Sequence, residues 1–367
     1  MRTPVDTLPG SEQNERITPV TNASNQERLM PAVRYVAVAI FACQGAAACA
    51  QTVDFYKGRQ IEMFLGSSVG GGYDQYGRLL GRHIARHIPG NPQIVFKNLT
   101  AGGGRQAINH VYNVAVADGT AIGTTLRTIP FDPLYGEEQT KIDALKMGWI
   151  GSLNSEVSVC VSWHTSPFRT LDDARKSEML MGTSGATSNE AINAKLLNVV
   201  AGTKFKLIHG YPGSTEVHLA MERGEVHGRC GFGWDSIVSR YRHWLDEKKI
   251  NVLVQLALTK HPDIPDVPSI LDLVKTPEHR QLAEFLVAPN QMGRPFFAPP
   301  GVPPERLEIL RKAFDAAARD PEFLADARKQ NMEISAMSGE NVRALVERIY
   351  ATPRTVVEVG KKIAGGG

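Results

Sequence analysis

Three consecutive glycines, Gly70–Gly72, stand between an apolar run and an amphipathic stretch, and Asp74 follows two residues later. Glycine leaves backbone N–H groups unshielded, so another molecule can approach the main chain closely. A glycine-rich turn that leads into a helix is a typical anion site, because the unpaired N–H groups and the helix dipole point the same way. The spacing therefore predicts that this turn binds an anion.

Four turns of glycine or small polar residues follow strand-like runs. They cover Ser67–Gly72, Ala101–Gly104, Gly182–Ser188 and Tyr211–Ser214. In open α/β sheets, ligands bind beyond the carboxyl ends of the strands, so we expect the turns to surround one cleft. Backbone N–H groups and Ser or Thr hydroxyls can satisfy the roughly four lone-pair sites of a carboxylate without a buried lysine or arginine.

Motifs for hydrolysis, phosphate binding and metal binding fit these turns poorly. No turn has the Lys followed by Ser or Thr that a phosphate loop requires. In a hydrolase elbow built on Ser184, Gly185 would stand one position too early. His83 and His87 are four residues apart but have no third ligand nearby in the sequence. We therefore expect no metal, no cofactor and no enzymatic activity.

One enzymatic alternative remains open. Gly102, Gly104 and Ala107 match the dinucleotide pattern GxGxxA after a strand. That motif also needs an acidic residue at the end of the next strand, and the chain has Thr and Arg there. The alternative is a cytoplasmic NAD(P)-dependent α/β oxidoreductase that uses the turn Gly102–Ala107.

The order of strand-like and helix-like runs indicates the fold class. Strand and helix alternate from Ile61 onward, and the pattern restarts at Trp149. A Pro-rich connector, His261–Ile270, follows the last strand of this middle block, and a helix is expected over Glu305–Ala318 after several prolines. Alternation of this kind predicts an α/β protein with two lobes, each a mostly parallel sheet flanked by helices.

The N-terminal region reads as an export signal. Residues 1–29 are polar and aperiodic, which predicts a disordered or misassigned extension with Met30 as the true start. Arg34, an apolar core and Ala48–Ala50 then form the layout of a secretory signal peptide over residues 30–50, with cleavage after Ala50. A lipoprotein anchored through Cys49 is the alternative. The mature protein is therefore expected in the periplasm.

Composition and cysteine content narrow the function classes further. The chain has 367 residues, of which 42% are hydrophobic, and its net charge is +3. A charge this close to neutral without a basic run gives no support for nucleic-acid binding.

Cys160 and Cys230 remain after cleavage, and an exported protein can keep a disulfide. The sequence leaves open whether these two cysteines pair.

The motifs in their order resemble those of one known family. After an export signal come "GSSVGGGYDQYGRLL", "NLTAGGGRQA", "MGTSGATS", "HGYPGSTEVHLAMERGEVHG" and "FFAPPGVPPERLEILRKAF". This order resembles the tripartite tricarboxylate transporter substrate-binding proteins, the Bug family, from about Phe55 to about Val359. The resemblance implies a periplasmic binding protein-like fold, with two α/β lobes joined by crossing strands and an acidic small molecule held in the cleft between them.

The resemblance also implies a division of the chain and a set of ligand-binding residues. Residues 51–152 would form the first part of lobe 1, residues 153–262 lobe 2, and residues 263–367 a return to lobe 1 plus C-terminal helices. The implied ligand-binding residues are Ser67, Ser68, Gly71, Gly72, Asp74, Gly103, Thr183, Ser184, Ala186, Thr187, Ser188, Tyr211, Gly213, Ser214, Trp234 and Asp235. Asp74 would repel a carboxylate directly, so we expect it to orient its loop or a bridging water.

The sequence therefore predicts an extracytoplasmic solute-binding protein that captures a small organic carboxylate. Its expected partners are the membrane subunits of a tripartite tricarboxylate-type transporter, and we expect the binding protein itself to be a monomer. A ligand-sensing partner of a membrane receptor kinase is a further alternative, because such a protein would use the same cleft.

Overall fold

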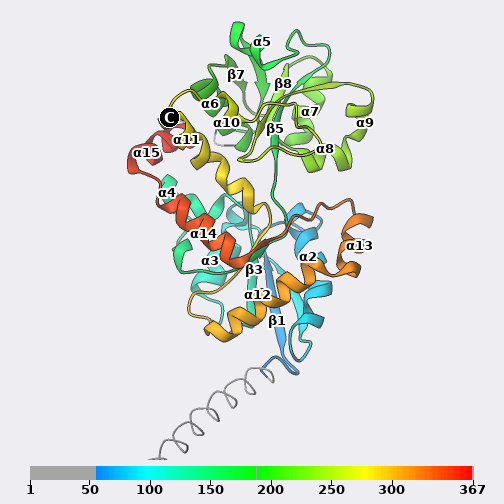
Figure 1. Cartoon of the computed structure of the whole chain (residues 1–367), viewed down its shortest axis with the longest axis vertical. Coiled ribbons are helices and arrows are strands. Elements are labelled where there is room, and N and C mark those ends of the chain that lie inside the picture. Colours follow the sequence, from blue (N-terminus) through cyan, green and yellow to red (C-terminus); the bar gives the residue numbers. More distant parts are fainter. Residues whose placement is uncertain (1–54, 187, 366–367) are drawn as a thin grey trace, which may run out of the picture. The chain divides into compact units, whose positions relative to one another are not determined.

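The computed structural model describes residues 55–186 and 188–365, and its strands form two sheets (Figure 1). The first sheet contains β1 (Gln60–Leu65), β2 (Gln93–Asn98), β3 (Ala121–Thr124), β4 (Gly148–Ser152), β10 (Pro295–Ala298) and β11 (Met337–Ser338). Its six strands lie in the order β11-β4-β10-β3-β1-β2. We call this sheet and the helices on it the first lobe. Those helices are α2 (Gly72–Ile84), η1 (Ala85–His87), η2 (Ala101–Gly104), α3 (Arg105–Asn113), η3 (Ile129–Phe131), α4 (Asp132–Tyr135), η4 (Ala144–Lys146), α12 (Pro304–Arg319), α13 (Pro321–Lys329) and α14 (Gly339–Tyr350).

The second sheet and its helices form the second lobe. The strands are β5 (Ser158–Trp163), β6 (Met179–Gly182), β7 (Phe205–Ile208), β8 (Gly228–Gly233) and β9 (Ile250–Leu256), in the order β7-β6-β8-β5-β9. The helices are α5 (Leu171–Lys176), α6 (Asn189–Ala201), α7 (Ser214–Glu222), α8 (Trp234–Arg240), α9 (Arg242–Asp246), α10 (Ile270–Leu273) and α11 (Pro277–Val287). The segment η5 (Ala288–Met292) leads back to β10, and α15 (Arg354–Ala364) ends the described chain.

Each sheet is mixed, which differs from the expected mostly parallel sheets. In the first sheet β1 pairs in parallel with β2 and β3, whereas β10 is antiparallel to β3 and β4, and β11 is antiparallel to β4. In the second sheet β6 is parallel to β7 and β8, and β5 is antiparallel to β8 and β9. The reason is the crossing of the chain: β4 leaves the first lobe and β10 returns to it, so neighbouring strands run in opposite directions.

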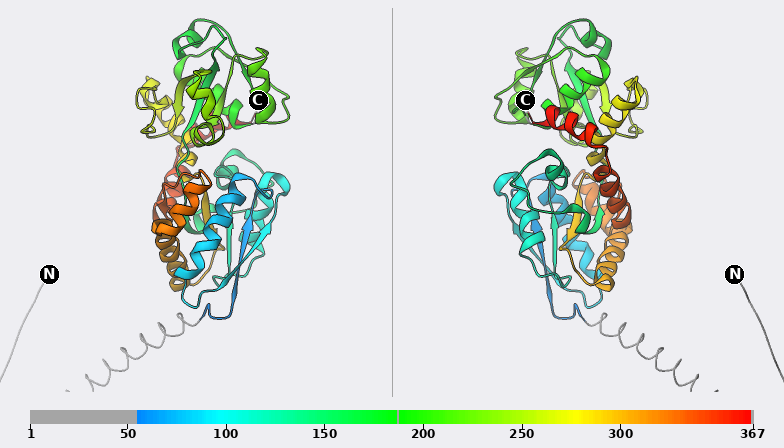
Figure 2. Two further views of the ribbon diagram at one scale, coloured as in Figure 1. Left: turned by 90° about the vertical axis from the view of Figure 1, so that its right-hand side faces the viewer. Right: turned by 90° about the vertical axis from the view of Figure 1, so that its left-hand side faces the viewer.

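Both faces of the first sheet are buried under helices. Along β1, Ile61 and Met63 lie in one core cluster with Leu80 of α2, while Phe64 lies in another with Val111 of α3. Successive side chains of a strand point to opposite faces, so this alternation requires helices on both sides. The two views in Figure 2 show helices on both sides of these strands.

The second sheet is covered in the same way. Met181 of β6 packs in a core with Leu197 of α6, and Val159 and Val161 of β5 pack on the opposite face with Met221 of α7. Helices on both faces of a sheet that contains parallel strands are typical of an α/β fold, so the predicted fold class is confirmed.

Short segments connect the lobes. Residues 153–157 join β4 to β5, and η5 with Gly293 and Arg294 leads to β10. Helices α10 and α11 contact α6, so the chain after residue 263 stays on the second lobe until β10, and α15 at the end of the described chain contacts α6 again. The boundaries of the lobes stay a prediction.

The extension over residues 1–29 and the signal peptide over residues 30–50 lie outside the described residues. No helix among the described residues has the length and apolar character needed to cross a membrane.

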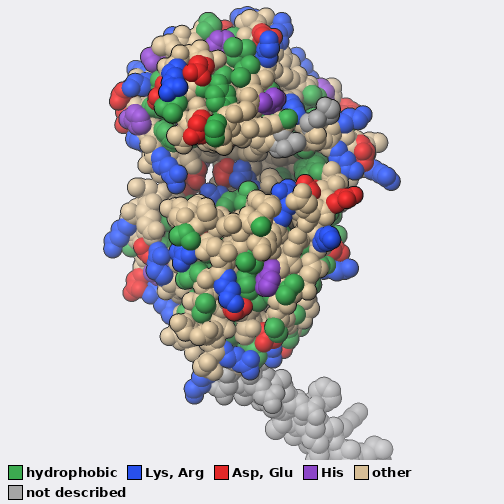
Figure 3. All heavy atoms as spheres, turned by 180° about the vertical axis from the view of Figure 1, so that it is seen from behind, with side chains coloured by type: hydrophobic (Ala, Val, Ile, Leu, Met, Phe, Trp, Pro, Cys, Tyr) green, Lys and Arg blue, Asp and Glu red, His purple; other side chains and the backbone are tan. Residues whose placement is uncertain are grey.

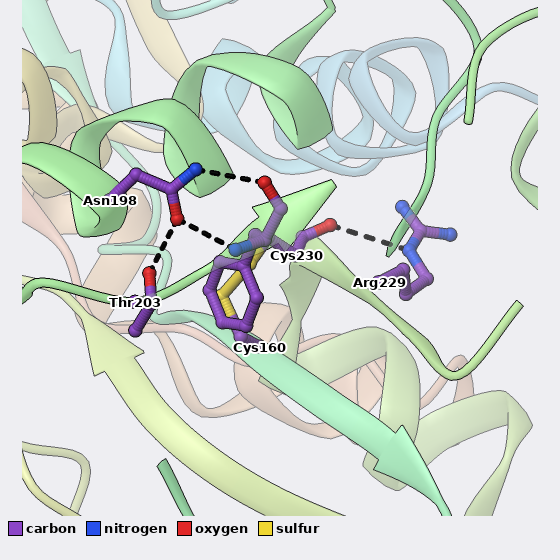
Figure 4. The surroundings of a disulfide bond; sticks show 6 residues. Cys160, Asn198, Thr203, Arg229 and Cys230 are labelled. Atoms are coloured by element: carbon purple, nitrogen blue, oxygen red, sulfur yellow. Dashed lines mark hydrogen bonds between the residues drawn. A yellow bond between two sulfur atoms is a disulfide. The ribbon is translucent and has the colours of Figure 1, made fainter. Parts of the chain in front are cut away.

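Cys160 and Cys230 form a disulfide between the neighbouring strands β5 and β8 (Figure 4). Their Cα atoms lie 3.9 Å apart and both side chains are buried. Beside the bond, the Asn198 side chain on α6 accepts hydrogen bonds from the Thr203 hydroxyl and from the Phe205 N–H, and donates one to the Phe205 carbonyl. The pairing that the sequence left open is therefore present, and it lies in the core of the second lobe.

We expect removal of this disulfide to destabilise the protein without unfolding it. The bond closes a loop between cysteines 70 residues apart, and the double variant Cys160→Ala/Cys230→Ala should lose roughly 2–4 kcal/mol of unfolding free energy because its unfolded chain is less constrained. Denaturant titration in the presence and absence of reductant measures this: reductant should affect only the wild type. Equal unfolding free energies for both proteins would contradict the expectation.

Candidate functional site

A cavity of about 430 Å³ lies between the lobes, at the start of α2 and the start of α8. Figure 3 shows acidic and basic side chains inside the hollow that separates the lobes on one face of the molecule. Its lining includes Gly72, Tyr73, Arg127, Glu156, Asp235 and Arg294. In the first lobe the loop 66–71 connects the end of β1 to α2, and in the second lobe β8 ends immediately before α8, so the cavity occupies the place where an open α/β sheet presents its ligand.

The Glu156 carboxylate binds two arginines at this cavity. Its Oε1 lies 2.7 Å from Arg127 Nη2, and its Oε2 lies 3.0 Å from Arg127 Nη1 and 3.1 Å from Arg294 Nη1. The three side chains are about nine-tenths buried. Burial alone would raise the pKa of Glu156, but the two guanidinium groups outweigh it and hold that pKa below its usual value. Glu156 is therefore charged at neutral pH.

Arg294 has one edge that nothing in the described chain fills. Its Nη1 donates to Glu156 and to the Gly293 carbonyl, whereas its buried Nε has no hydrogen-bond partner among the described residues. A Cβ placed on Gly72 would lie 3.6 Å from Nη2 and 4.0 Å from Nε, so this edge borders the start of α2. Two donors of a planar guanidinium group thus lie without hydrogen-bond partners in the described chain, beside a helix N-terminus that lines the cavity, and of these two Nε is buried.

Two tyrosines hold Arg294 in this orientation. Its guanidinium carbon lies 4.7 Å from the centre of the Tyr73 ring and 5.0 Å from the centre of the Tyr76 ring. Such cation–π contacts favour a charged group over the ring face. Burial works against the charge on Arg294, but Tyr73, Glu156 and Asp235 outweigh it and raise its pKa. Arg294 stays protonated across the physiological range.

The glycine triplet differs from the expected open cradle. The Gly70 N–H donates to Asp74 Oδ2 (2.9 Å) and the Gly71 N–H donates to the Ser68 carbonyl (3.0 Å), so both groups are used inside the loop. The positive φ lies at Gly70, at 80°, and Gly71 has a φ of −70°. Gly72 is the first residue of α2, where a helix leaves N–H groups without internal acceptors.

Asp74 organises this loop. The side chain is buried and accepts from the Gly70 N–H, from Arg78 Nε and from the Asn98 side chain. Burial would raise the pKa of Asp74, but these hydrogen bonds to Arg78, Asn98 and Gly70 lower it. In the same loop, Ser67 is half-buried with its hydroxyl unpartnered among the described residues, and Ser68 is exposed.

The second glycine-rich turn packs against the first. Gly104 has a φ of 96°, and a Cβ there would lie 2.3 Å from the Gly66 carbonyl oxygen, so only glycine fits. The Thr125 hydroxyl donates to the Gly104 carbonyl, and the Gly66 N–H donates to the Thr124 carbonyl. The ends of β1, β2 and β3 are thus joined. Gly103, also with positive φ, is exposed on this turn.

The predicted residues of the second lobe lie at the ends of β6 and β7. Thr183 is buried with its hydroxyl 2.6 Å from His209 Nδ1, and Ser188 caps α6 by accepting from the Ala191 N–H. The remaining members are arranged as follows: Ser184 is half-buried, Ala186 and Ser214 are exposed, Tyr211 and Gly213 are partly buried, and Thr187 lies outside the described residues. Within the described second lobe, the cavity is lined from α8 rather than from these turns.

Of the predicted set, the cavity brings together Gly72 and Asp235. Trp234, next to Asp235, is buried, and its indole N–H donates to Asp263 Oδ2. Glu156 and Arg294 are not among the predicted residues, and Arg127 is singled out in the sequence only as the residue that breaks a dinucleotide motif. The available signal for Arg127 was an arginine three residues after the end of β3. No local pattern marks the other two, because their partners are far away in the sequence.

A buried polar network lies behind the Ser184 turn. The Ser184 hydroxyl donates to Glu190 Oε2, Glu190 Oε1 accepts from Arg229 Nη2 (3.0 Å), and Arg229 Nη1 donates to His218 Nε2 (2.8 Å). Arginine cannot accept a hydrogen bond, so Nε2 of His218 must be unprotonated. Burial, together with the charge of Arg229, lowers the pKa of His218 to about 3. His218 is therefore neutral in the folded protein.

Comparisons with known proteins agree with this architecture. No protein-family model matches the chain. A protein of Pseudomonas sp. (strain P51), named "UPF0065 protein in tcbD-tcbE intergenic region", is 25% identical over 289 residues, which is 77% of this chain and 80% of that protein. A TctC solute-binding protein from Polaromonas has a solved structure with a TM-score of 0.67 at 20% identity, covering 83% of this chain and 99% of that one.

Two more solved structures are similar at lower scores. The periplasmic binding protein BugD has a TM-score of 0.58 at 17% identity, with 84% of this chain and 98% of that one covered. MatC from Rhodopseudomonas palustris with bound malate has a TM-score of 0.58 at 18% identity, with 82% and 99% covered. At these identities the likeness shows the fold. The resemblance to TctC and Bug proteins that the motifs indicated is confirmed.

Because His218 stays neutral when folded, we expect it to make the protein less stable in mild acid. Between pH 6.5, where the unfolded histidine gains a proton, and about pH 3, where the folded one does, unfolding free energy should fall by roughly 1.4 kcal/mol per pH unit from this residue alone. Above pH 6.5 the histidine is neutral in both states, so it no longer makes the unfolding free energy depend on pH. The variant His218→Gln, which keeps an acceptor for Arg229, should show a flatter profile in denaturant titrations across this range. The exposed His243→Gln is the matched control, and a slope in His218→Gln as steep as in that control would refute the account.

Proposed function

We propose that this chain, which has the fold of the TctC solute-binding proteins, captures a small organic carboxylate between its lobes and delivers it to the membrane subunits of a tripartite tricarboxylate-type transporter. The observation that carries the proposal is the unpartnered edge of Arg294, which borders Gly72 at the start of α2. The protein binds its ligand without transforming it. When the ligand binds, the two lobes close around it by a hinge motion at the segments that connect them, as in other two-lobed binding proteins.

The chemistry of that edge selects a carboxylate. The Nε and Nη2 donors of an arginine form a planar fork that matches the two oxygens of a carboxylate. The first-turn N–H groups of α2, a helix of 13 residues, point toward the same place and add a favourable dipole. Gly72 has no side chain to block this approach. A cavity of about 430 Å³ fits a small molecule.

The energy available is consistent with reversible capture. A hydrogen bond to a charged group contributes roughly 1.5–3 kcal/mol, so two from Arg294 and one or two from the backbone supply on the order of 5–10 kcal/mol. The loss of translational freedom on binding offsets part of this, which leaves roughly micromolar affinity. A carrier that must also release its ligand needs affinity in that range.

Further observations support the proposed class of ligand and the proposed location of the protein. MatC, which shares this fold, has malate bound, and malate is a small carboxylate. The signal-peptide pattern over residues 30–50 supports a periplasmic mature protein. The Thr183–Ser188 and Tyr211–Ser214 turns of the second lobe would hold the far end of the ligand once the lobes close.

The variant Arg294→Lys tests the proposal. Lysine keeps a charge but not the planar fork, so the loss of two charge-assisted hydrogen bonds should lower affinity at least about a hundredfold. The probe is the carboxylate that raises the melting temperature most in a screen of mono-, di- and tricarboxylates, and calorimetry measures its affinity. A second variant, Gly72→Ala, keeps Arg294 in place but puts a methyl group 3.6 Å from Nη2, so it should also weaken binding.

The matched control is Arg343→Lys on α14, where Arg343 pairs with Glu347 in an exposed ion pair. It should bind the probe like wild type. Melting curves without ligand separate loss of binding from loss of folding. If Arg294→Lys and Gly72→Ala both bind the probe as tightly as the control does, Arg294 does not hold the carboxylate and the proposed site is wrong.

A further inference from the structure

Asp235 carries a carboxylate oxygen that faces the cavity without a hydrogen-bond donor. Its Oδ1 accepts from the Ser236 N–H at 2.6 Å and from the Ser236 hydroxyl at 3.3 Å. Its Oδ2 accepts no hydrogen bond among the described residues, and the nearest cationic atom is Arg294 Nη2 at 3.8 Å. That distance is too long for a hydrogen bond. The side chain is largely buried, with 18% of it exposed.

Of the other charged groups that line the cavity, Glu156 and Arg127 are already paired, whereas Arg240 is exposed and has no ion pair among the described residues. Both oxygens of Glu156 accept from guanidinium nitrogens, and Arg127 uses Nη1 and Nη2 on Glu156 and Nε on the Asn290 side chain. Among Arg127, Glu156, Arg294 and Asp235, the donors left over are Nε and Nη2 of Arg294. The acceptor left over is Oδ2 of Asp235. One free donor edge thus stands beside one free acceptor.

We propose that the ligand carries a hydrogen-bond donor, an ammonium or a hydroxyl group, on the carbon next to its carboxylate, and that Asp235 accepts from this donor. The inference rests on the proposed function, in which Arg294 binds the carboxylate. A donor on that carbon lies close enough to the carboxylate oxygens to reach an acceptor 3.8 Å from the guanidinium nitrogen.

Two physical arguments support this assignment. Burial and the repulsion of Glu156 raise the pKa of Asp235, and Arg294 with Ser236 offsets this only in part, so its charge lacks full compensation before ligand binds. A ligand with a plain methylene group at this position would also displace water from Oδ2 without donating a hydrogen bond to it. Sites built to hydrogen-bond a polar group discriminate strongly against analogues that lack it. Asp235 therefore acts as a specificity-determining residue.

Two matched series of acids test the inference by calorimetry on the full-length mature protein. The aliphatic series is succinate, L-malate and L-aspartate, and the aromatic series is 3-phenylpropionate, L-3-phenyllactate and L-phenylalanine. In a series that fits the cavity, the substituted acids should bind at least about tenfold more tightly than the unsubstituted acid. A stronger amino acid identifies ammonium as the donor, and a stronger hydroxy acid identifies hydroxyl.

The variant Asp235→Ala should abolish this preference and leave the affinity for the unsubstituted acid unchanged or higher, and Asp235→Asn should reduce the preference. A purely structural role of Asp235 would lower all affinities together and leave the ratios as they were. Asp266→Ala, at an exposed position of the same lobe, is the control and should keep the preference. Melting curves without ligand show whether each variant is folded.

The failures of the two proposals differ. If the unsubstituted acid binds wild type as tightly as its substituted partners, and Arg294→Lys abolishes that binding, the carboxylate site stands and the role of Asp235 is refuted. A preference that survives in Asp235→Ala refutes it as well. If wild type binds neither an acid of these series nor any carboxylate of the melting-temperature screen, the carboxylate site and this inference are both overturned.

Discussion

The ion cluster of Glu156 with Arg127 and Arg294 determines the geometry of everything around the cavity. Each member comes from a different segment: Arg127 follows β3, Glu156 lies between β4 and β5, and Arg294 precedes β10. Asn290 joins the same junction, because it accepts from Arg127 Nε and donates to the Leu256 carbonyl, and its own carbonyl accepts from the Glu156 N–H. Removing one partner of such a buried pair typically costs about 3–5 kcal/mol. The segments that connect the lobes therefore meet at a fixed point.

The cluster also decides which donors remain for a ligand. Glu156 accepts from one terminal nitrogen of Arg294, and the rings of Tyr73 and Tyr76 pack against the guanidinium group, so the Nε and Nη2 edge is left beside Gly72 at the start of α2. Lysine at this position would provide a single point charge and no second pair of donors. When the cavity is empty, the negative charge of Glu156 stabilises the buried positive charge of Arg294. The Nε and Nη2 edge remains without a partner among the residues that the structure describes and can bind an anion. Structure and recognition are thus divided between two sides of one guanidinium group.

Local sequence patterns were sufficient for the fold and insufficient for this cluster. The strand that begins at Ile61, the helix after the glycine triplet and the helix predicted at Glu305–Ala318 could be located, because periodicity, glycine turns and prolines are short-range signals. The sheets are mixed because β4 leaves a lobe and β10 enters it, which only the tertiary path reveals. Glu156 pairs with residues 29 and 138 positions away, and no spacing rule spans such distances. The glycine triplet was recognised, but its N–H groups bond within the loop, which depends on Asp74 being buried.

The central claim is that the free edge of Arg294 binds the ligand carboxylate, and arginine side-chain NMR addresses it most directly. With ¹⁵N-labelled arginine, the Nε–H resonance of Arg294 can be assigned by its absence in Arg294→Lys. At saturation with the carboxylate that stabilises the protein most, we expect this resonance to move downfield and to exchange more slowly with water. The Nε–H of Arg127, already bonded to Asn290, should barely change. An Arg294 Nε–H resonance that stays in place while calorimetry shows full occupancy would contradict the account.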